Sequence, residues 1–161
     1  MKTRLLLVAP LCALLLIAGA ARADVKPSSL FSDHMVLQSG MSVPVWGTAD
    51  PGEKVTVSFL GQVRSATAGA DGKWMVRLSN LKDGGPYTMT IAGKNTIVIR
   101  DVLVGEVWLG SGQSNMVFNV SKRHRPYGLM NEDEEIAAAN YPQVRMFTVK
   151  DDKSYTPQED V

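Results

Sequence analysis

The fold is decided by the stretch Asp101-Val-Leu-Val-Gly-Glu-Val-Trp-Leu-Gly-Ser-Gly-Gln-Ser-Asn-Met116. Residues 102–109 are apolar except for Gly105 and Glu106, and residues 110–115 are small or polar. A short apolar run with β-branched residues that ends in glycine and serine predicts a buried strand followed by a tight turn. In open α/β sheets, ligands bind at the carboxyl ends of the strands. The stretch therefore predicts an α/β domain with a functional site in this turn.

Ser114 is the candidate nucleophile in the turn. A serine presented there would have backbone N–H groups close by, and such groups stabilise the oxyanion of an acyl-transfer reaction. Its neighbours Gln113 and Asn115 are candidates for orienting the substrate or the oxyanion. The same residues also suit an ordinary loop, and the pattern differs from the Gly-x-Ser-x-Gly elbow because Met116 stands where the second glycine would be.

Three segments of the chain resemble the sialate O-acetylesterase family, a branch of the SGNH hydrolases. They are Gly105-Glu-Val-Trp-Leu-Gly-Ser-Gly-Gln-Ser-Asn-Met116, the upstream Leu30-Phe-Ser-Asp-His-Met-Val-Leu-Gln38 with Val43-Pro-Val-Trp-Gly-Thr-Ala49, and the downstream Val144-Arg-Met-Phe-Thr-Val149. The resemblance implies a serine esterase that removes O-acetyl groups from sialic acids or related sugars, with Ser114 as the nucleophile. It implies no cofactor and no metal.

The same resemblance identifies what the chain lacks. The catalytic histidine of the family lies in an Asp-x-x-His segment near the carboxyl end, and the 161 residues contain no such segment. The glycine and asparagine that complete the oxyanion hole in related hydrolases are also missing. Family members often carry an acidic residue and a tryptophan after the Asn-Met pair, where this chain has Val117-Phe118. We therefore expect the amino-terminal portion of a longer enzyme, inactive by itself.

A cleavable export signal is predicted at the amino terminus. Met1–Arg4 is basic, Leu5–Ala18 is apolar and Ala21-Arg-Ala23 is a small-x-small cleavage pattern, so residues 1–23 are expected to be removed and the protein secreted or periplasmic. The alternative is a retained anchor. Cleavage removes three cations and no acid, changing the net charge from +1 to −2, which is too near neutral to predict a nucleic-acid partner. The single cysteine, Cys12, lies within the signal, so the mature chain has no disulfide or thiolate site.

Residues 24–100 predict an antiparallel β-sandwich-like domain. Val55–Phe59, Lys73–Leu78 and Tyr87–Ile91 alternate apolar and polar residues, which is typical of strands with one buried face. Turn residues separate them at Asp50-Pro-Gly52, Asp71-Gly72, Asp83-Gly-Gly-Pro86 and Gly93-Lys-Asn95. Trp46, Trp74 and Tyr87 are candidates for a sugar-stacking platform or, at this spacing, for the core. His34 has no second histidine or carboxylate cluster nearby in sequence, which favours a structural role.

Residues 101–161 predict the start of an SGNH-type α/β domain, with its boundary near Arg100-Asp101. Lys122, Arg123 and Arg125 form a basic loop that could attract an acidic sugar or simply be solvated, and nothing ties His124 to Ser114 as a base. Residues 131–140 predict a short helix with Asn131 as N-cap and Glu134 in capping-box position. Val144–Val149 predicts the next strand, which would complete a βαβ unit. Oligomeric state is left open, and no membrane contact is expected after cleavage. The alternative function is a secreted carbohydrate-binding or adaptor β-domain without catalysis.

Overall fold

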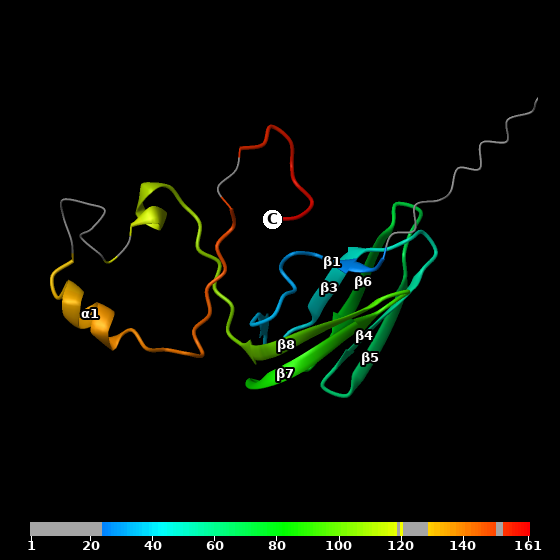
Figure 1. Cartoon of the computed structure of the whole chain (residues 1–161), viewed down its shortest axis with the longest axis horizontal. Coiled ribbons are helices and arrows are strands. Elements are labelled where there is room, and N and C mark those ends of the chain that lie inside the picture. The colour runs from blue at the N-terminus through cyan, green and yellow to red at the C-terminus, as the bar shows by residue number, and fades with distance from the viewer. Residues whose placement is uncertain (1–23, 119, 121–128, 151–152) are drawn as a thin grey trace, which may run out of the picture.

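The computed structural model describes residues 24–118, 120, 129–150 and 153–161, and most of its regular structure is β-sheet (Figure 1). The predicted signal peptide over residues 1–23 and the predicted basic loop with Lys122, Arg123, His124 and Arg125 lie outside the described residues. The elements are β1 (Lys26–Pro27), β2 (Val36–Gln38), β3 (Val43–Thr48), β4 (Lys54–Phe59), β5 (Gln62–Thr67), β6 (Lys73–Leu78), β7 (Gly84–Ala92), β8 (Thr96–Gly105), the 3-10 helix η1 (Ser114–Val117) and α1 (Glu132–Ala138).

The strands form two sheets that share one apolar core. The smaller sheet has the order β1-β3-β6 and is antiparallel; the larger has the order β2-β8-β7-β4-β5 and is antiparallel except for the parallel pair β2–β8. Alternate residues point inward: Trp74, Val76 and Leu78 of β6 are buried, and the residues between them are exposed. Val55, Val57 and Phe59 of β4 are buried in the same way. The structure is mostly β-sheet with few helices, which agrees with the expected mixed fold, and the sandwich description stays a prediction.

The strands of the two sheets, β1 to β8, are called the β-rich part below. The strands predicted in this part are present, with one turn misplaced. β4, β6 and β7 contain the three alternating segments, and turns occur at 50–52, 71–72 and 93–95. Gly84-Gly-Pro86 was expected in a turn but begins β7, because the chain reverses earlier, before Gly84. Trp74 is buried, whereas Trp46 and Tyr87 are partly buried and pack against the core. The aromatic residues therefore belong to the core, although Trp46 keeps part of its ring surface exposed.

β8 lies between β2 and β7 and crosses the predicted domain boundary without a break. Leu103 pairs with Val36 of β2, and Val102 pairs with Tyr87 of β7. Asp101, in the middle of the strand, has a φ of +56°, a conformation that Asp tolerates better than most residues. The sheet hydrogen bonding thus extends to Gly105. The division of the chain into domains at residue 100 stays a prediction, but no strand ends there.

The strand predicted to run to Leu109 ends at Gly105, four residues early. Trp108 and Leu109 are 90% and 95% exposed and carry no sheet hydrogen bonds among the described residues. The strand predicted over Val144–Val149 is also not formed, and Met146 is 91% exposed. A parallel strand needs a neighbouring strand and cover on both faces, and these apolar residues have neither within the part that is described. The prediction of a βαβ unit is therefore wrong for these residues.

The helix predicted over 131–140 is confirmed as α1, with a different start from the one expected. Asn131 occupies the N-cap position with a φ of +67°, and its side chain makes no capping hydrogen bond. The capping box with Glu134 is therefore absent. Glu132, Asp133, Glu134 and Glu135 fill the first turn, where the positive end of the helix dipole favours acids. No helix among residues 24–161 that the structure describes has the length and apolar character needed to cross a membrane.

Candidate functional site

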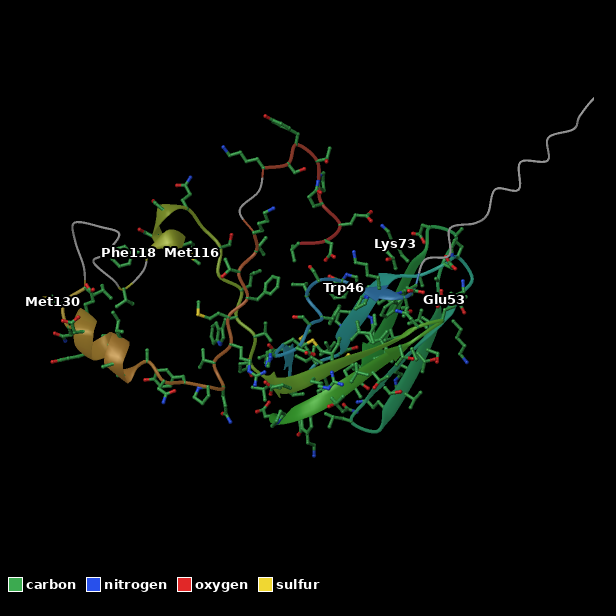
Figure 2. The ribbon with its side chains drawn as sticks, viewed as in Figure 1. Trp46, Glu53, Lys73, Met116, Phe118 and Met130 are labelled. Atoms are coloured by element: carbon green, nitrogen blue, oxygen red, sulfur yellow. The ribbon has the colours of Figure 1, made fainter. Side chains whose placement is uncertain are left out.

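Ser114 is exposed and opens η1, at the end of the glycine-rich turn. The Met116 amide donates to the Gln113 carbonyl oxygen at 2.9 Å, which closes the turn. The Met116 side chain folds back over the two preceding glycines: a Cβ at Gly110 or Gly112 would lie 2.8 or 3.0 Å from its carbon atoms. The Met116 side chain and the two glycines are therefore in close contact. Figure 2 shows Met116 and Phe118 well away from the two sheets.

Ser114 lies outside the strands of both sheets. Residues 106–113, which are exposed and irregular, separate Ser114 from the end of β8, so the serine is not at the strand tip as predicted. It lines neither of the two cavities described below. No group of three His, Cys, Asp or Glu residues that could hold a metal occurs within the described ranges. Gln113 and Asn115 are exposed on either side of Ser114, and their proposed orienting roles stay predictions.

Asp101 ties the loop before β2 to the segment after α1. Its carboxylate lies 2.5 Å from His34 Nδ1 and accepts a hydrogen bond from Arg145 at 2.9 Å. Arg145 also donates to the Asp101 carbonyl oxygen at 2.5 Å. The Arg145 guanidinium, followed by His34, holds the pKa of Asp101 below its usual value. His34 therefore has a carboxylate partner, as a structural histidine would, and the structure places it against Asp101 rather than Ser114.

We expect Asp101→Asn to expose Arg145 to proteolysis. Asparagine tolerates the positive φ at this position, so the change removes the carboxylate charge and leaves the backbone preference in place. The Arg145 guanidinium would then leave its partner more often, and tryptic cleavage after Arg145 should accelerate by about twofold to fivefold, the range for a partly exposed ion pair. Peptide mass spectrometry of a timed digest measures this rate. Cleavage after Lys82, an exposed residue in the loop before β7, is the internal control and should not change.

A cavity of about 1010 Å³ lies beside the Asp101 junction, between the sheet edge and residues 143–147. Gln38 is one of the residues that line this cavity. Its side-chain oxygen accepts a hydrogen bond from the Val107 amide at 2.8 Å, and its side-chain nitrogen donates one to the Glu106 carboxylate at 3.2 Å. Its walls are mainly apolar and include Trp46, Leu103 and Phe147. Gln38 and Asp101 thus fix the two segments that flank the glycine-rich turn against the β-rich part.

A second cavity, of about 610 Å³, lies on the outer face of the three-stranded sheet, where the chain's last residues dock. The Asp160 carboxylate accepts hydrogen bonds from the Ser28 hydroxyl at 2.7 Å, the Ser29 hydroxyl at 2.9 Å and the Ser29 amide at 3.0 Å. These donors, led by Ser28, lower the pKa of Asp160 from 3.8 to about 2. Lys73 binds Glu159 at 2.6 Å, and this contact raises the pKa of Lys73.

The lowered pKa predicts a pH dependence for this docking. The ionised carboxylate is the bound form, so the contribution of Asp160 is complete above pH 3.8 and is lost as the pH falls through about 2. A carboxyl carbon-13 NMR titration should give a midpoint near 2 for Asp160. Ser28→Ala should move the midpoint up toward 3.8, because it removes the first of the donors. Ser32→Ala, in the same loop but not bonded to Asp160, should leave the midpoint unchanged; an equal shift there would contradict the assignment.

Comparison of the sequence with known proteins finds relatives that share one name. The chain is 36% identical to the mouse sialate O-acetylesterase over 152 residues and 34% identical to the human sialate O-acetylesterase over 148 residues. These identities support the resemblance to the sialate O-acetylesterase family. The mouse alignment covers 84% of this chain and 27% of the mouse protein, so the chain spans about a quarter of the length of these relatives. No protein-family model matches the chain.

A solved structure agrees with the fold. A carbohydrate acetylesterase from Xanthomonas citri superposes with a TM-score of 0.76 at 36% sequence identity, over 84% of this chain and 30% of that protein. The resemblance of the chain to sialate O-acetylesterases is thus supported over 84% of its length. Sequence reasoning missed the Asp101–Arg145 pair and the serine pair that holds Asp160, because both join residues far apart in the chain and neither has a local pattern.

Proposed function

We propose that this chain supplies the serine nucleophile of an esterase that removes O-acetyl groups from sialic acids or related sugars. The observation that carries the proposal is the 36% identity to a sialate O-acetylesterase, together with a glycine-rich turn that leaves Ser114 exposed. In this mechanism the Ser114 hydroxyl attacks the acetyl carbonyl, and amide N–H groups of the turn stabilise the oxyanion. Gln113 and Asn115 orient the turn or the substrate.

The mechanism requires a base, and we propose that this base lies outside the 161 residues. A serine hydroxyl is a weak nucleophile until a neighbouring group takes its proton. Neither histidine of the sequence supplies that base in the proposal: the structure pairs His34 with Asp101, and His124 lies outside the described residues. An Asp-x-x-His segment encoded after Val161 would provide it. We further propose that residues 1–23 direct export and are removed.

Hydrolysis of an aryl acetate tests the proposal. The 161-residue chain should hydrolyse it no faster than its own Ser114→Ala variant, because the base is absent. A longer product of the same open reading frame that carries an Asp-x-x-His segment should hydrolyse it readily, and should release acetate from O-acetylated sialic acid. A stop codon directly after Val161 with no activity in the native protein would instead favour the carbohydrate-binding alternative.

A further inference from the structure

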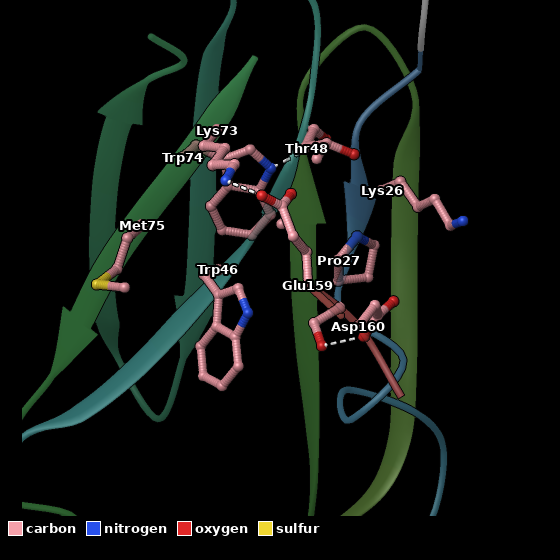
Figure 3. A pocket seen from close by; sticks show the side chains of 11 residues that line it. Lys26, Pro27, Trp46, Thr48, Lys73, Trp74, Met75, Glu159 and Asp160 are labelled. Carbon is pink, nitrogen blue, oxygen red and sulfur yellow. Dashed lines mark hydrogen bonds and ion pairs between the residues drawn. The ribbon is translucent and has the colours of Figure 1, made fainter. Parts of the chain in front are cut away.

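The cavity on the outer face of the three-stranded sheet has the features of a built binding site (Figure 3). Its floor is formed by β3 and β6, and one wall is formed by the loop after β1. Its volume of about 610 Å³ lies within the range of small-molecule sites. Ser114 does not line it, so any ligand there would be bound away from the proposed nucleophile.

One wall of the cavity is adapted to a carboxylate. Ser28 and Ser29 present two hydroxyls and one amide N–H to the Asp160 carboxylate, all within 3.1 Å. Ser28 is itself 7% exposed, and its amide donates to the Trp46 carbonyl oxygen, so the loop is held against β3. Lys73 supplies an ammonium group beside this wall, where it binds Glu159. A carboxylate bound in place of Asp160 therefore meets directed donors, and the cavity that holds it also contains a positive charge.

The floor of the cavity is aromatic. Trp46 is partly buried, and its ring meets Phe31 edge to face, with centroids 4.8 Å apart at 86°. Figure 3 shows the indole of Trp46 near the docked Glu159 and Asp160, with Trp74 behind. Trp74 is fixed by a hydrogen bond from its Nε1 to the Thr48 carbonyl oxygen at 3.1 Å. The Trp46 indole packs against Phe31 and is only partly buried. It therefore suits the C–H face of a sugar ring, since aromatic rings offer a rigid apolar contact surface.

We propose that this cavity is a second binding site, for an acidic monosaccharide. The sugar's carboxylate takes the place of the Asp160 carboxylate on Ser28 and Ser29, and its ring lies on Trp46. Residues Glu159-Asp160 and the sugar then compete for the same donors. The choice of an acidic sugar rests on the proposed function, and the site would hold such a sugar near the enzyme without reacting with it.

Because the sugar and residues Glu159-Asp160 compete for the same donors, weakening the tail contact should strengthen sugar binding. N-acetylneuraminic acid is titrated into the nitrogen-15-labelled Ser114→Ala chain, and amide shifts are followed at Ser29, Trp46 and Lys73. Asp160→Asn weakens the chain's own tail contact and should tighten sugar binding by about threefold or more. In that Asp160→Asn background, the double change Ser28→Ala with Ser29→Ala should weaken binding by about tenfold, as expected for lost hydrogen bonds to a charged group.

The methyl ester of the same sugar is the matched control, because it lacks the charge and keeps the ring. Equal binding of the ester would overturn the carboxylate assignment. Absence of amide shifts with millimolar N-acetylneuraminic acid in the Asp160→Asn variant would overturn the proposed site. Shifts produced by a peptide of residues 153–161 but not by the sugar would also overturn it, because the cavity would then bind only the chain's own tail. No step of the assay involves hydrolysis. A protein that binds the sugar but never cleaves esters would contradict the proposed function alone, and the reverse result would contradict this site alone.

Discussion

Ser114→Ala should reduce aryl acetate hydrolysis by at least about a thousandfold in the active, longer product of the reading frame. The expectation follows from the role of the hydroxyl, since no acyl intermediate forms without it and only binding and oxyanion stabilisation remain. The loss should appear in kcat rather than in KM, because the methyl-sized change leaves ground-state binding of the acetate nearly intact. Steady-state kinetics with the aryl acetate measures both parameters.

Ser111 offers a matched control three residues earlier in the same exposed turn. Ser111→Ala makes the same chemical change and should keep activity within about threefold of the parent, as is usual for a substitution that removes no reacting group. Circular dichroism should be the same for both variants. Unchanged turnover in the Ser114→Ala variant would exclude Ser114 as the nucleophile. Equal losses of activity in the two variants would mean that the substitutions act through the geometry of the turn.

Leu78→Ala should lower the free energy of unfolding of the β-rich part by about 2–5 kcal/mol, the range for a leucine removed from a packed core. Leu78 is fully buried at the end of β6, with both sheets contributing to the core around it. The substitution loses the transfer free energy of the isobutyl group and leaves a cavity that stiff neighbouring strands can close only in part. Urea unfolding followed by tryptophan fluorescence gives the change, because Trp74 lies in the same core.

Met75 lies on the same strand with its side chain on the outer face and half of it exposed. Met75→Ala should lower the free energy of unfolding by less than about 1 kcal/mol, because little packed contact is lost. Comparable losses for Leu78→Ala and Met75→Ala would mean that the inner and outer faces of the small sheet have been assigned wrongly.

The β-rich part could be predicted from sequence because its signals are local. Alternation in β4 and β6 gives the buried face directly, and the turns at 50–52 and 71–72 follow from residues that accept turn geometry. β5 was missed because Gln62–Thr67 lies at the sheet edge with most of its residues exposed, so it shows little apolar alternation. The strand over Val144–Val149 was predicted from composition, but β structure also needs a partner, which composition does not reveal.

The candidate site was predictable only in its most local part. The glycine-rich pattern led to Ser114, which the structure places at the start of η1. The Asp101–Arg145 pair and the contact of Asp160 with Ser28 join residues that are 44 and 132 positions apart. Such contacts depend on the finished topology, and no window of the sequence contains both partners.

The position of β8 between β2 and β7 also sets an order of events during synthesis. β4, β5 and β7 can pair with one another once Ala92 is available, but β2 has to wait for β8, the strand that it pairs with among those described. Until Gly105 has left the ribosome, the unpaired backbone edge of β7 and the unpaired β2 are open to wrong partners. The nascent chain should therefore depend most on chaperones in this interval, and a pause in translation just after β7 would prolong that dependence.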